Sequence, residues 1–222
     1  MIPLRDTQPS YTFPFVTIAI IVLNVVAFLY EFSLDPYELN DFIARYGVIP
    51  TRFQWMDVLT SIFLHGGWMH LIGNMWFLWI YGDNIEDILG HSQFLIFYLA
   101  CGVAATVVHI VFNMDSRIPT LGASGAIAGV MGAYVVKFPH SRITTLVPVF
   151  VFLTTMEIPA YFILLYWFVI QFFSGIGSVG HSHLSQGGVA WFAHIGGFLA
   201  GVLLILLMPT KTRWSHRPEY RW

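Results

Sequence analysis

The sequence has little charge: only 10% of its 222 residues are Asp, Glu, Lys or Arg, whereas soluble domains average roughly 25%. Hydrophobic residues make up 57% of the chain. So few charges cannot cover a water-facing surface, which excludes an ordinary soluble domain. The formal net charge of −2 gives no basis for a nucleic-acid partner. The composition therefore predicts a polytopic membrane protein surrounded by membrane lipids.

Cysteine and metal-binding motifs are also scarce. Cys101 is the only cysteine, which excludes an intramolecular disulfide and is read as a small apolar residue in a membrane helix. There is no HExxH motif, and His65 and His70 are five residues apart, a poor spacing for joint ligation on one helix face. The histidines in 181–183 are read as part of a flexible loop. The spacing of these residues therefore gives no support for a metal site.

Paired intramembrane carboxylates are absent as well, which disfavours an aspartyl mechanism. Glu86 lies beside Asp83 and Asp87 and is expected to be an interfacial loop acid. Glu157 lies two residues before Pro159, and we expect it to bond backbone groups that the proline frees.

What the sequence does have is apolar runs, each near the ~20 residues that a helical span requires. They are 13–30, 68–82, 92–112, 123–138, 149–172 and 189–208. We expect an all-α bundle of six transmembrane helices in a single domain, 1–222. The first run has no small-residue cleavage site and is expected to stay as an anchor. The 31–67 loop is expected to be partly embedded and re-entrant, and the Gly/Ser/His-rich loop 173–188 to be mobile.

The Lys/Arg distribution predicts the orientation. With a cytoplasmic N-terminus (1–12) and tail (209–222), seven basic residues lie inside and three outside. The inside residues are Arg5, Lys137, Arg142, Lys211, Arg213, Arg217 and Arg221, and the outside residues are Arg45, Arg52 and Arg117. We therefore expect a multi-pass integral membrane protein with both termini cytoplasmic.

Two polar residues at membrane depth suggest a functional site, because such residues are costly in hydrocarbon. Ser124 heads a glycine-lined apolar segment, and His194 lies inside another. A serine hydroxyl needs a base within hydrogen-bond reach, and histidine suits that role. No Asp or Glu lies near His194 in sequence, so we predict a Ser–His dyad without a third group. Ala126 replaces the last glycine of the G-x-S-x-G elbow, so the soluble lipase fold is unsupported.

Stripes of small residues could bring the serine and the histidine together. One stripe is Gly125, Gly129 and Gly132, and the other is Ala193, Gly197 and Gly201. Stripes with this spacing let helix backbones approach closely. By themselves such stripes favour simple packing seams; a serine and a histidine on adjoining faces favour a site instead.

An acyl-transfer site also needs donors for the developing oxyanion. Ser124 lies near a helix N-terminus, where backbone N–H groups are free. His70 and Asn74 are four residues apart, so they point the same way and both can donate. The alternative is that they bond each other or loop carbonyls. His65 and His109 are read as structural.

These motifs together resemble the rhomboid family of intramembrane serine proteases, of the bacterial type. The matching patterns are His65-x4-His70-x3-Asn74, Gly122-x-Ser124-Gly125 and Ala193-His194-x2-Gly197-x3-Gly201. The resemblance implies proteolysis of transmembrane protein substrates without metal or cofactor. It implies Ser124 as nucleophile, His194 as base, and His70, Asn74 and the Ser124 N–H as the oxyanion hole. The fifth helix and the 173–188 loop would form the substrate gate and cap.

The chain departs from the family pattern in two places. Arg45-Tyr46 and Trp55-Met56-Asp57 stand where the first outer loop often carries a Trp-Arg pair, which puts that loop's fixing contacts in doubt. Ala128 stands where some members have a tyrosine that stacks on the histidine, so we expect close packing near Gly129 to hold His194.

The sequence disfavours two rival functions. A non-catalytic rhomboid-like scaffold for binding or quality control usually lacks the serine or the histidine, and this chain has both. A small-solute transporter would need inverted repeats or broken helices with ion-pair sites, and no internal repeat is visible. No sequence pattern predicts an oligomeric state.

Overall fold

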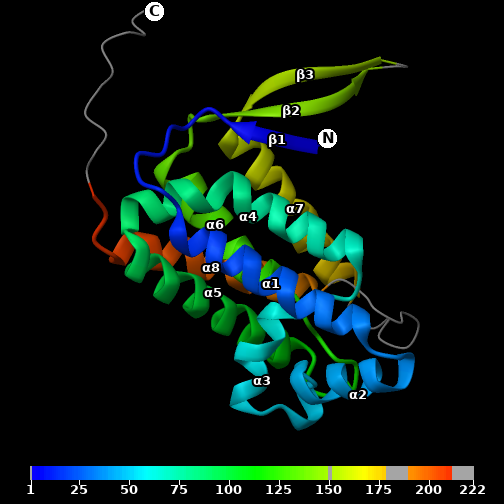
Figure 1. Ribbon diagram of the computed structural model, residues 1–222. Coiled ribbons are helices and arrows are strands. Elements are labelled where there is room, and N and C mark those ends of the chain that lie inside the picture. Colours follow the sequence, from blue (N-terminus) through cyan, green and yellow to red (C-terminus); the bar gives the residue numbers. More distant parts are fainter. Residues whose placement is uncertain (1, 150–151, 179–189, 212–222) are drawn as a thin grey trace, which may run out of the picture.

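The structure is a computed structural model that describes residues 2–149, 152–178 and 190–211. Most of these residues are helical, and three strands form a small sheet on one side of the bundle (Figure 1). The helices are α1 (Phe15–Ser33), α2 (Pro36–Tyr46), η1 (Pro50–Arg52), α3 (Trp55–Thr60), η2 (Ser61–Phe63), α4 (Trp68–Leu89), α5 (His91–Phe112), α6 (Ser124–Lys137), α7 (Ala160–Ser178) and α8 (Trp191–Leu207). The strands are β1 (Ile2–Asp6), β2 (Arg142–Val149) and β3 (Phe152–Pro159).

Among the described residues, two helices are long and apolar enough to cross a membrane, α1 and α5. The apolar helices Ser124–Lys137, Ala160–Phe173 and Trp191–Leu207 are shorter. Helix α4 has 22 residues but carries three acidic side chains near its C-terminal end, Asp83, Glu86 and Asp87. The six-span count therefore stays a prediction, although helices occupy the expected positions of all six segments.

The expectation of an all-α fold is wrong between α6 and α7. The predicted segment 149–172 is a helix only from Ala160; before it, β2 and β3 form an antiparallel hairpin, with Arg142 opposite Pro159. Strand β1 pairs with the other edge of β2. Threonines, branched residues and phenylalanines favour strands, and Pro148 would break a continuous helix. Glu157 does not bond freed backbone: it is exposed in β3, with its carboxylate 3.9 Å from Arg142.

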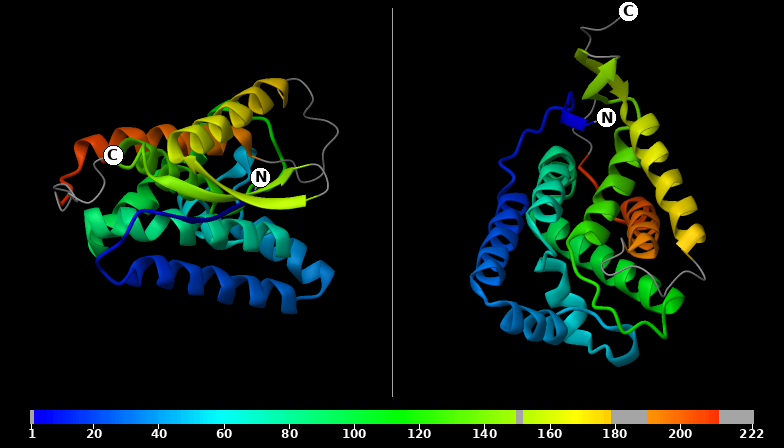
Figure 2. Two further views of the ribbon diagram at one scale, coloured as in Figure 1. Left: turned by 90° about the horizontal axis from the view of Figure 1, so that it is seen from above. Right: turned by 90° about the vertical axis from the view of Figure 1, so that its right-hand side faces the viewer.

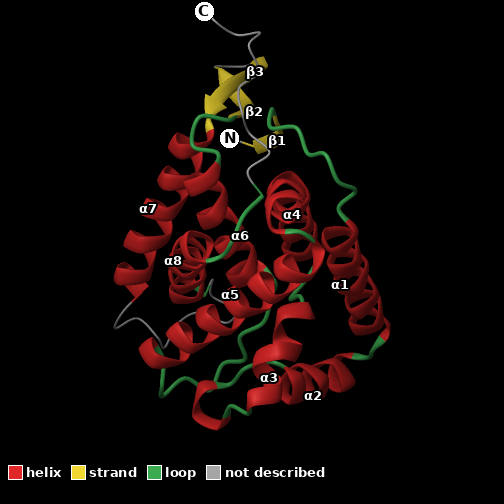
Figure 3. Cartoon of the chain, turned by 90° about the vertical axis from the view of Figure 1, so that its left-hand side faces the viewer, coloured by secondary structure: helices red, strands yellow, loops and turns green. Residues whose placement is uncertain are grey.

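The 31–67 loop is built from short helices. Asp35 caps α2 with a reciprocal capping box, and Asp57 accepts from Gln54 N at 3.0 Å at the start of α3. Helices α2 and α3 lie on the side of the bundle opposite the sheet (Figure 3). The contacts within this loop include these helix caps and a bond from Arg52 Nη2 to Ala44 O at 2.8 Å, which the family pattern did not indicate.

Glu86 is not a loop acid, because α4 continues to Leu89 and buries it. Its carboxylate accepts from Val16 N at 2.9 Å and from Thr17 N at 2.8 Å, and the Thr17 hydroxyl donates at 2.7 Å. Pro14, which precedes α1, supplies no side-chain cap. Glu86 therefore satisfies the free N–H groups of α1 from a neighbouring helix.

Helix α8 lies among α5, α6 and α7 (Figure 2, right). The backbones of α6 and α8 approach so closely that a Cβ added at Gly197 would overlap the Gly125 carbonyl oxygen. A Cβ added at Gly201 would likewise overlap the Gly129 carbonyl oxygen. The two small-residue stripes pack against each other, and this contact places the starts of α6 and α8 together.

Candidate active site

The segment before Ser124 is fixed by backbone hydrogen bonds. Val48 and Thr120 exchange N–H···O bonds of 2.9 and 2.8 Å, and Gly122 N donates to Ser61 O at 2.8 Å. Gly122 has φ +127°, a conformation that favours glycine. The turn ends at Ser124, the first residue of α6, where backbone N–H groups lack intrahelical partners.

The serine and the histidine meet at this position. His194 Nε2 lies 2.8 Å from Ser124 Oγ, across 70 residues of sequence. His194 is in the first turn of α8 and is buried, with 8% of its surface exposed. The nucleophile and base expected from the sequence are therefore within hydrogen-bond reach, as such a pair requires.

A third group contacts the histidine, which sequence reasoning missed. Gln171 Oε1 in α7 lies 2.6 Å from His194 Nδ1, on the ring edge away from Ser124. The expectation that no third group contacts His194 is therefore wrong. The signal for this residue in the sequence is the single side-chain amide in the apolar run of α7, which lies 23 residues from His194.

Two tryptophans flank the His194 ring. The Trp167 ring in α7 lies 5.6 Å from it, and the Trp191 ring lies 6.4 Å away, both measured between ring centroids. The expectation that close packing near Gly129 alone replaces the missing tyrosine at Ala128 is therefore incomplete. Aromatic side chains from α7 and α8 also pack beside the His194 ring.

His70 lies beside the serine. A Cβ built on Gly122 would be 2.7 Å from His70 Nε2 and 3.7 Å from Ser124 Oγ, so Gly122 separates these groups by very little space. His70 Nδ1 accepts from Gly66 N at 3.3 Å. Because Nδ1 is an acceptor, the neutral ring carries its proton on Nε2, which faces the site.

Asn74 has a different partner. Its side-chain nitrogen lies 2.9 Å from His65 Nε2, and both residues are buried. His65 N in turn donates to the Glu31 carboxylate at 3.2 Å. The structure thus brings His70 to Ser124 and ties Asn74 to the His65 ring, which is neither the oxyanion role expected for Asn74 nor the alternative of a bond to His70 or to loop carbonyls.

His109 is buried and bonds Thr120 Oγ1 through Nε2 at 2.8 Å. This contact agrees with its interpretation as a structural residue. Among the described residues, no group of three or more His, Cys, Asp or Glu side chains is placed to hold a metal ion. The 181–183 histidines and most of the predicted 173–188 loop lie outside the described residues.

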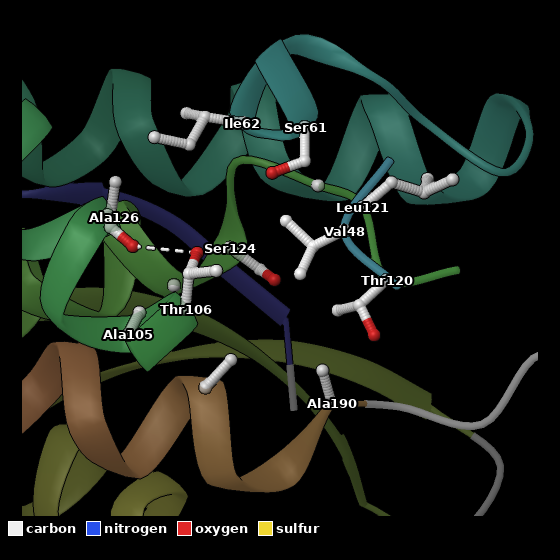
Figure 4. Close-up of a pocket in the computed structure, with 14 residues that line it drawn as sticks. Val48, Ser61, Ile62, Ala105, Thr106, Thr120, Leu121, Ser124, Ala126 and Ala190 are labelled. Atoms are coloured by element: carbon white, nitrogen blue, oxygen red, sulfur yellow. Dashed lines mark hydrogen bonds between the residues drawn. The ribbon is translucent and has the colours of Figure 1, made fainter. Parts of the chain in front are cut away.

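A small cavity of about 20 Å³ opens beside Ser124 (Figure 4). Its walls come from α5, α8, and the segments around Ser61 and Thr120. A cavity of this size holds one water molecule. Most of its lining residues are small, and they include Gly125, Ala105 and Ala193.

Comparison with known proteins finds relatives of this chain. The chain is 34% identical over 132 residues to Rhomboid protease GluP of Bacillus subtilis, covering 58% of this chain and 25% of that protein. It is 39% identical over 98 residues to Presenilin-associated rhomboid-like protein, mitochondrial, of Bos taurus, covering 43% and 26%. It is 30% identical over 153 residues to Rhomboid protein 1, mitochondrial, of Saccharomyces cerevisiae, covering 67% and 40%.

The chain therefore spans less than half the length of each of these three relatives. The family match is broader: residues 52–211 match the Rhomboid domain, a stretch that includes His70, Ser124, Gln171 and His194. Because this match covers most of the chain, the protein belongs to the rhomboid family, whose members are embedded in membranes and include proteases.

Proposed function

We propose that the chain is an intramembrane serine endopeptidase. The observation that carries the proposal is the 2.8 Å contact between Ser124 Oγ and His194 Nε2 in a buried, mostly apolar setting. A hydroxyl and an imidazole in this geometry form the general-base pair that acyl transfer uses.

The reaction follows from the geometry. His194 Nε2 takes the Ser124 hydroxyl proton while Oγ attacks the scissile carbonyl carbon, giving a tetrahedral oxyanion. The imidazolium then donates that proton to the leaving amine, the C–N bond breaks, and an acyl-serine remains. A water molecule activated by the same nitrogen hydrolyses the ester and releases the acid. The small cavity beside Ser124 has room for such a water.

Donors for the oxyanion surround the nucleophile. The Ser124 backbone N–H is at the start of α6, where it lacks an intrahelical partner, and His70 Nε2 lies near Gly122. Asn74 is one helical turn beyond His70 and uses one of its two amide N–H groups on His65, which leaves it a second N–H to donate to the oxyanion. Donors preorganised in a dry site stabilise developing charge far better than water does.

The proposed substrates are single-span membrane proteins. A peptide bond inside a helix is shielded by its own hydrogen bonds, so the segment must unwind before Oγ can reach the carbonyl. The cavity of small residues beside Ser124 fits a small side chain next to the cut.

We further propose a bacterial inner membrane with both termini cytoplasmic. Lys211 N donates to Ile88 O, and Lys137 Nζ donates to Thr210 Oγ1, so the ends of α4, α6 and the chain after α8 lie together. Two of the relatives are mitochondrial by name, which makes a mitochondrial membrane the competing location.

The alternative function is a non-catalytic rhomboid-like scaffold that binds membrane proteins. Labelling with a fluorophosphonate, followed by mass-spectrometric mapping, separates the two. An active serine protease is modified at Ser124, and the His194→Ala variant is not. A folded wild-type protein that stays unlabelled at Ser124 would support the scaffold.

A further inference from the structure

Helix α7 contains a single side-chain amide in an otherwise apolar sequence. Gln171 is buried, with 7% of its surface exposed. An amide that is buried without a partner is costly in such surroundings. The Gln171 Oε1 atom lies 2.6 Å from His194 Nδ1.

This contact determines which ring nitrogen carries the proton. An amide oxygen has no hydrogen and can only accept, so His194 Nδ1 must be the N–H donor. The neutral ring then has its lone pair on Nε2, which faces Ser124 Oγ at 2.8 Å. In the opposite tautomer Nε2 would carry the proton and could not accept one from the serine.

The same helix also limits the tilt of the ring. Trp167 is four residues before Gln171, so both side chains lie on one face of α7. The Trp167 ring is 5.6 Å from the His194 ring, at an interplanar angle of 39°. One residue of α7 therefore fixes the Nδ1 edge of the imidazole, and a second packs against its face.

We propose that Gln171 is a positioning residue that holds His194 in the Nδ1–H tautomer and aims Nε2 at Ser124, a role that rests on the proposed protease function. The amide continues to accept from Nδ1 after Nε2 gains the serine proton, so the ring stays in place through both proton transfers. A neutral acceptor does this without placing a permanent charge in the membrane, where a carboxylate would be expensive.

The test compares two substitutions at this position. Gln171→Met keeps a flexible side chain of similar length but removes the acceptor, and Gln171→Glu keeps an accepting oxygen in either protonation state. Gln93→Met in α5 is the matched control. Gln93 lies near Leu89 and Pro209, and about 18 Å of helix separates it from Ala105, the residue of α5 that packs on Gly125.

Purified, monodisperse variants are assayed for kcat and KM on a transmembrane reporter substrate. We expect Gln171→Met to lower kcat by roughly tenfold or more with little change in KM, as part of the 10²–10⁴ that a general base contributes. Gln171→Glu should recover activity relative to Gln171→Met, and Gln93→Met should match the wild type. A Gln171→Met enzyme within twofold of wild type, or a Gln171→Glu enzyme no better than Gln171→Met, overturns the proposal.

A spectroscopic readout separates this inference from the protease assignment. The ¹⁵N chemical shifts of the His194 ring, assigned by difference with His194→Ala, report the tautomer without any substrate. We expect the Nδ1–H form in the wild type and loss of that preference in Gln171→Met. Unchanged ring shifts in Gln171→Met contradict the positioning role, whereas an inactive wild type with the expected shifts contradicts only the protease function.

Discussion

Ser124 and His194 could be predicted from the sequence because their chemistry is unusual for their surroundings. Each lies beside a small-residue stripe, and the packing of Gly197 against the Gly125 carbonyl brings them together. Gln171 could not be predicted in the same way. It lies 23 residues from His194 on another helix, and only the packing of α7 on α8 makes the two neighbours.

Two buried histidines, His194 and His109, should differ in importance. We expect His194→Ala to remove at least about a thousandfold of turnover, because base and nucleophile act as a unit. His109→Ala should retain most activity, since His109 bonds Thr120 and no contact joins it to Ser124 Oγ. The measurement is kcat on a transmembrane substrate, with each variant checked for monodispersity. Equal losses in the two variants would contradict the assignment of the base.

The oxyanion donors should also be unequal. His70 Nε2 is next to Gly122 and the serine, whereas one of the two Asn74 amide N–H groups bonds His65. We expect His70→Phe to lower kcat by about a hundredfold, a typical effect of losing one donor. Asn74→Ala should lower it less.

The measured quantity for both variants is kcat at saturating substrate. A wild-type kcat in Asn74→Ala would remove that residue from the hole, and a larger loss in Asn74→Ala than in His70→Phe would reverse the order of the two donors.

At the scale of elements, the contact between α6 and α8 sets the site geometry. We expect Gly197→Val to abolish labelling of Ser124 by a fluorophosphonate, because the added carbons would collide with the Gly125 carbonyl and push the helices apart. A shift of about 1 Å can cost a hundredfold in rate.

Gly73→Val in α4 is the matched control, since a Cβ there meets nothing within 4 Å. This variant makes the same chemical change in a helix, and it should label like the wild type. Wild-type labelling of Gly197→Val would show that the close approach of α6 and α8 is dispensable for the site.

The helices were more predictable than the sheet. The apolar runs of α1 and α5 match their predicted segments within a few residues, because a hydrophobic stretch of that length has few alternatives in a membrane. The segment 149–172, predicted as one helix, instead contains strand β3 and most of helix α7. Apolarity alone does not distinguish a strand from a helix, and the pairing of β2 with the distant β1 is a tertiary contact.

At the scale of the whole molecule, Asp6 ties the sheet to the bundle. Tyr134 Oη in α6 donates to the Asp6 carboxylate at 2.5 Å, and Ser141 Oγ lies 3.0 Å from the same hydroxyl. Burial raises the pKa of Asp6 from 3.8 to about 7, because it disfavours the charged form; the bond from Tyr134 opposes this rise and the nearby Asp83 adds to it.

A raised carboxyl pKa makes stability fall with increasing pH. Between pH 4 and about 7 the folded chain holds a proton on Asp6 that the unfolded chain releases, so the contribution of Asp6 is present at pH 4 and lost as the pH passes 7. We expect the wild-type melting temperature in detergent to decline over this window more steeply than that of Asp6→Asn. Parallel curves for the two proteins would contradict this linkage.

The central claim is that Ser124 and His194 hydrolyse a peptide bond within the membrane. Its most direct measurement is the cleavage of a single-span substrate by the purified protein in liposomes, with the product ends identified by mass spectrometry. We predict that the wild type cuts in or next to the transmembrane segment and that Ser124→Ala, equally folded and incorporated, makes no detectable product. Cleavage by Ser124→Ala at the wild-type rate would contradict the account.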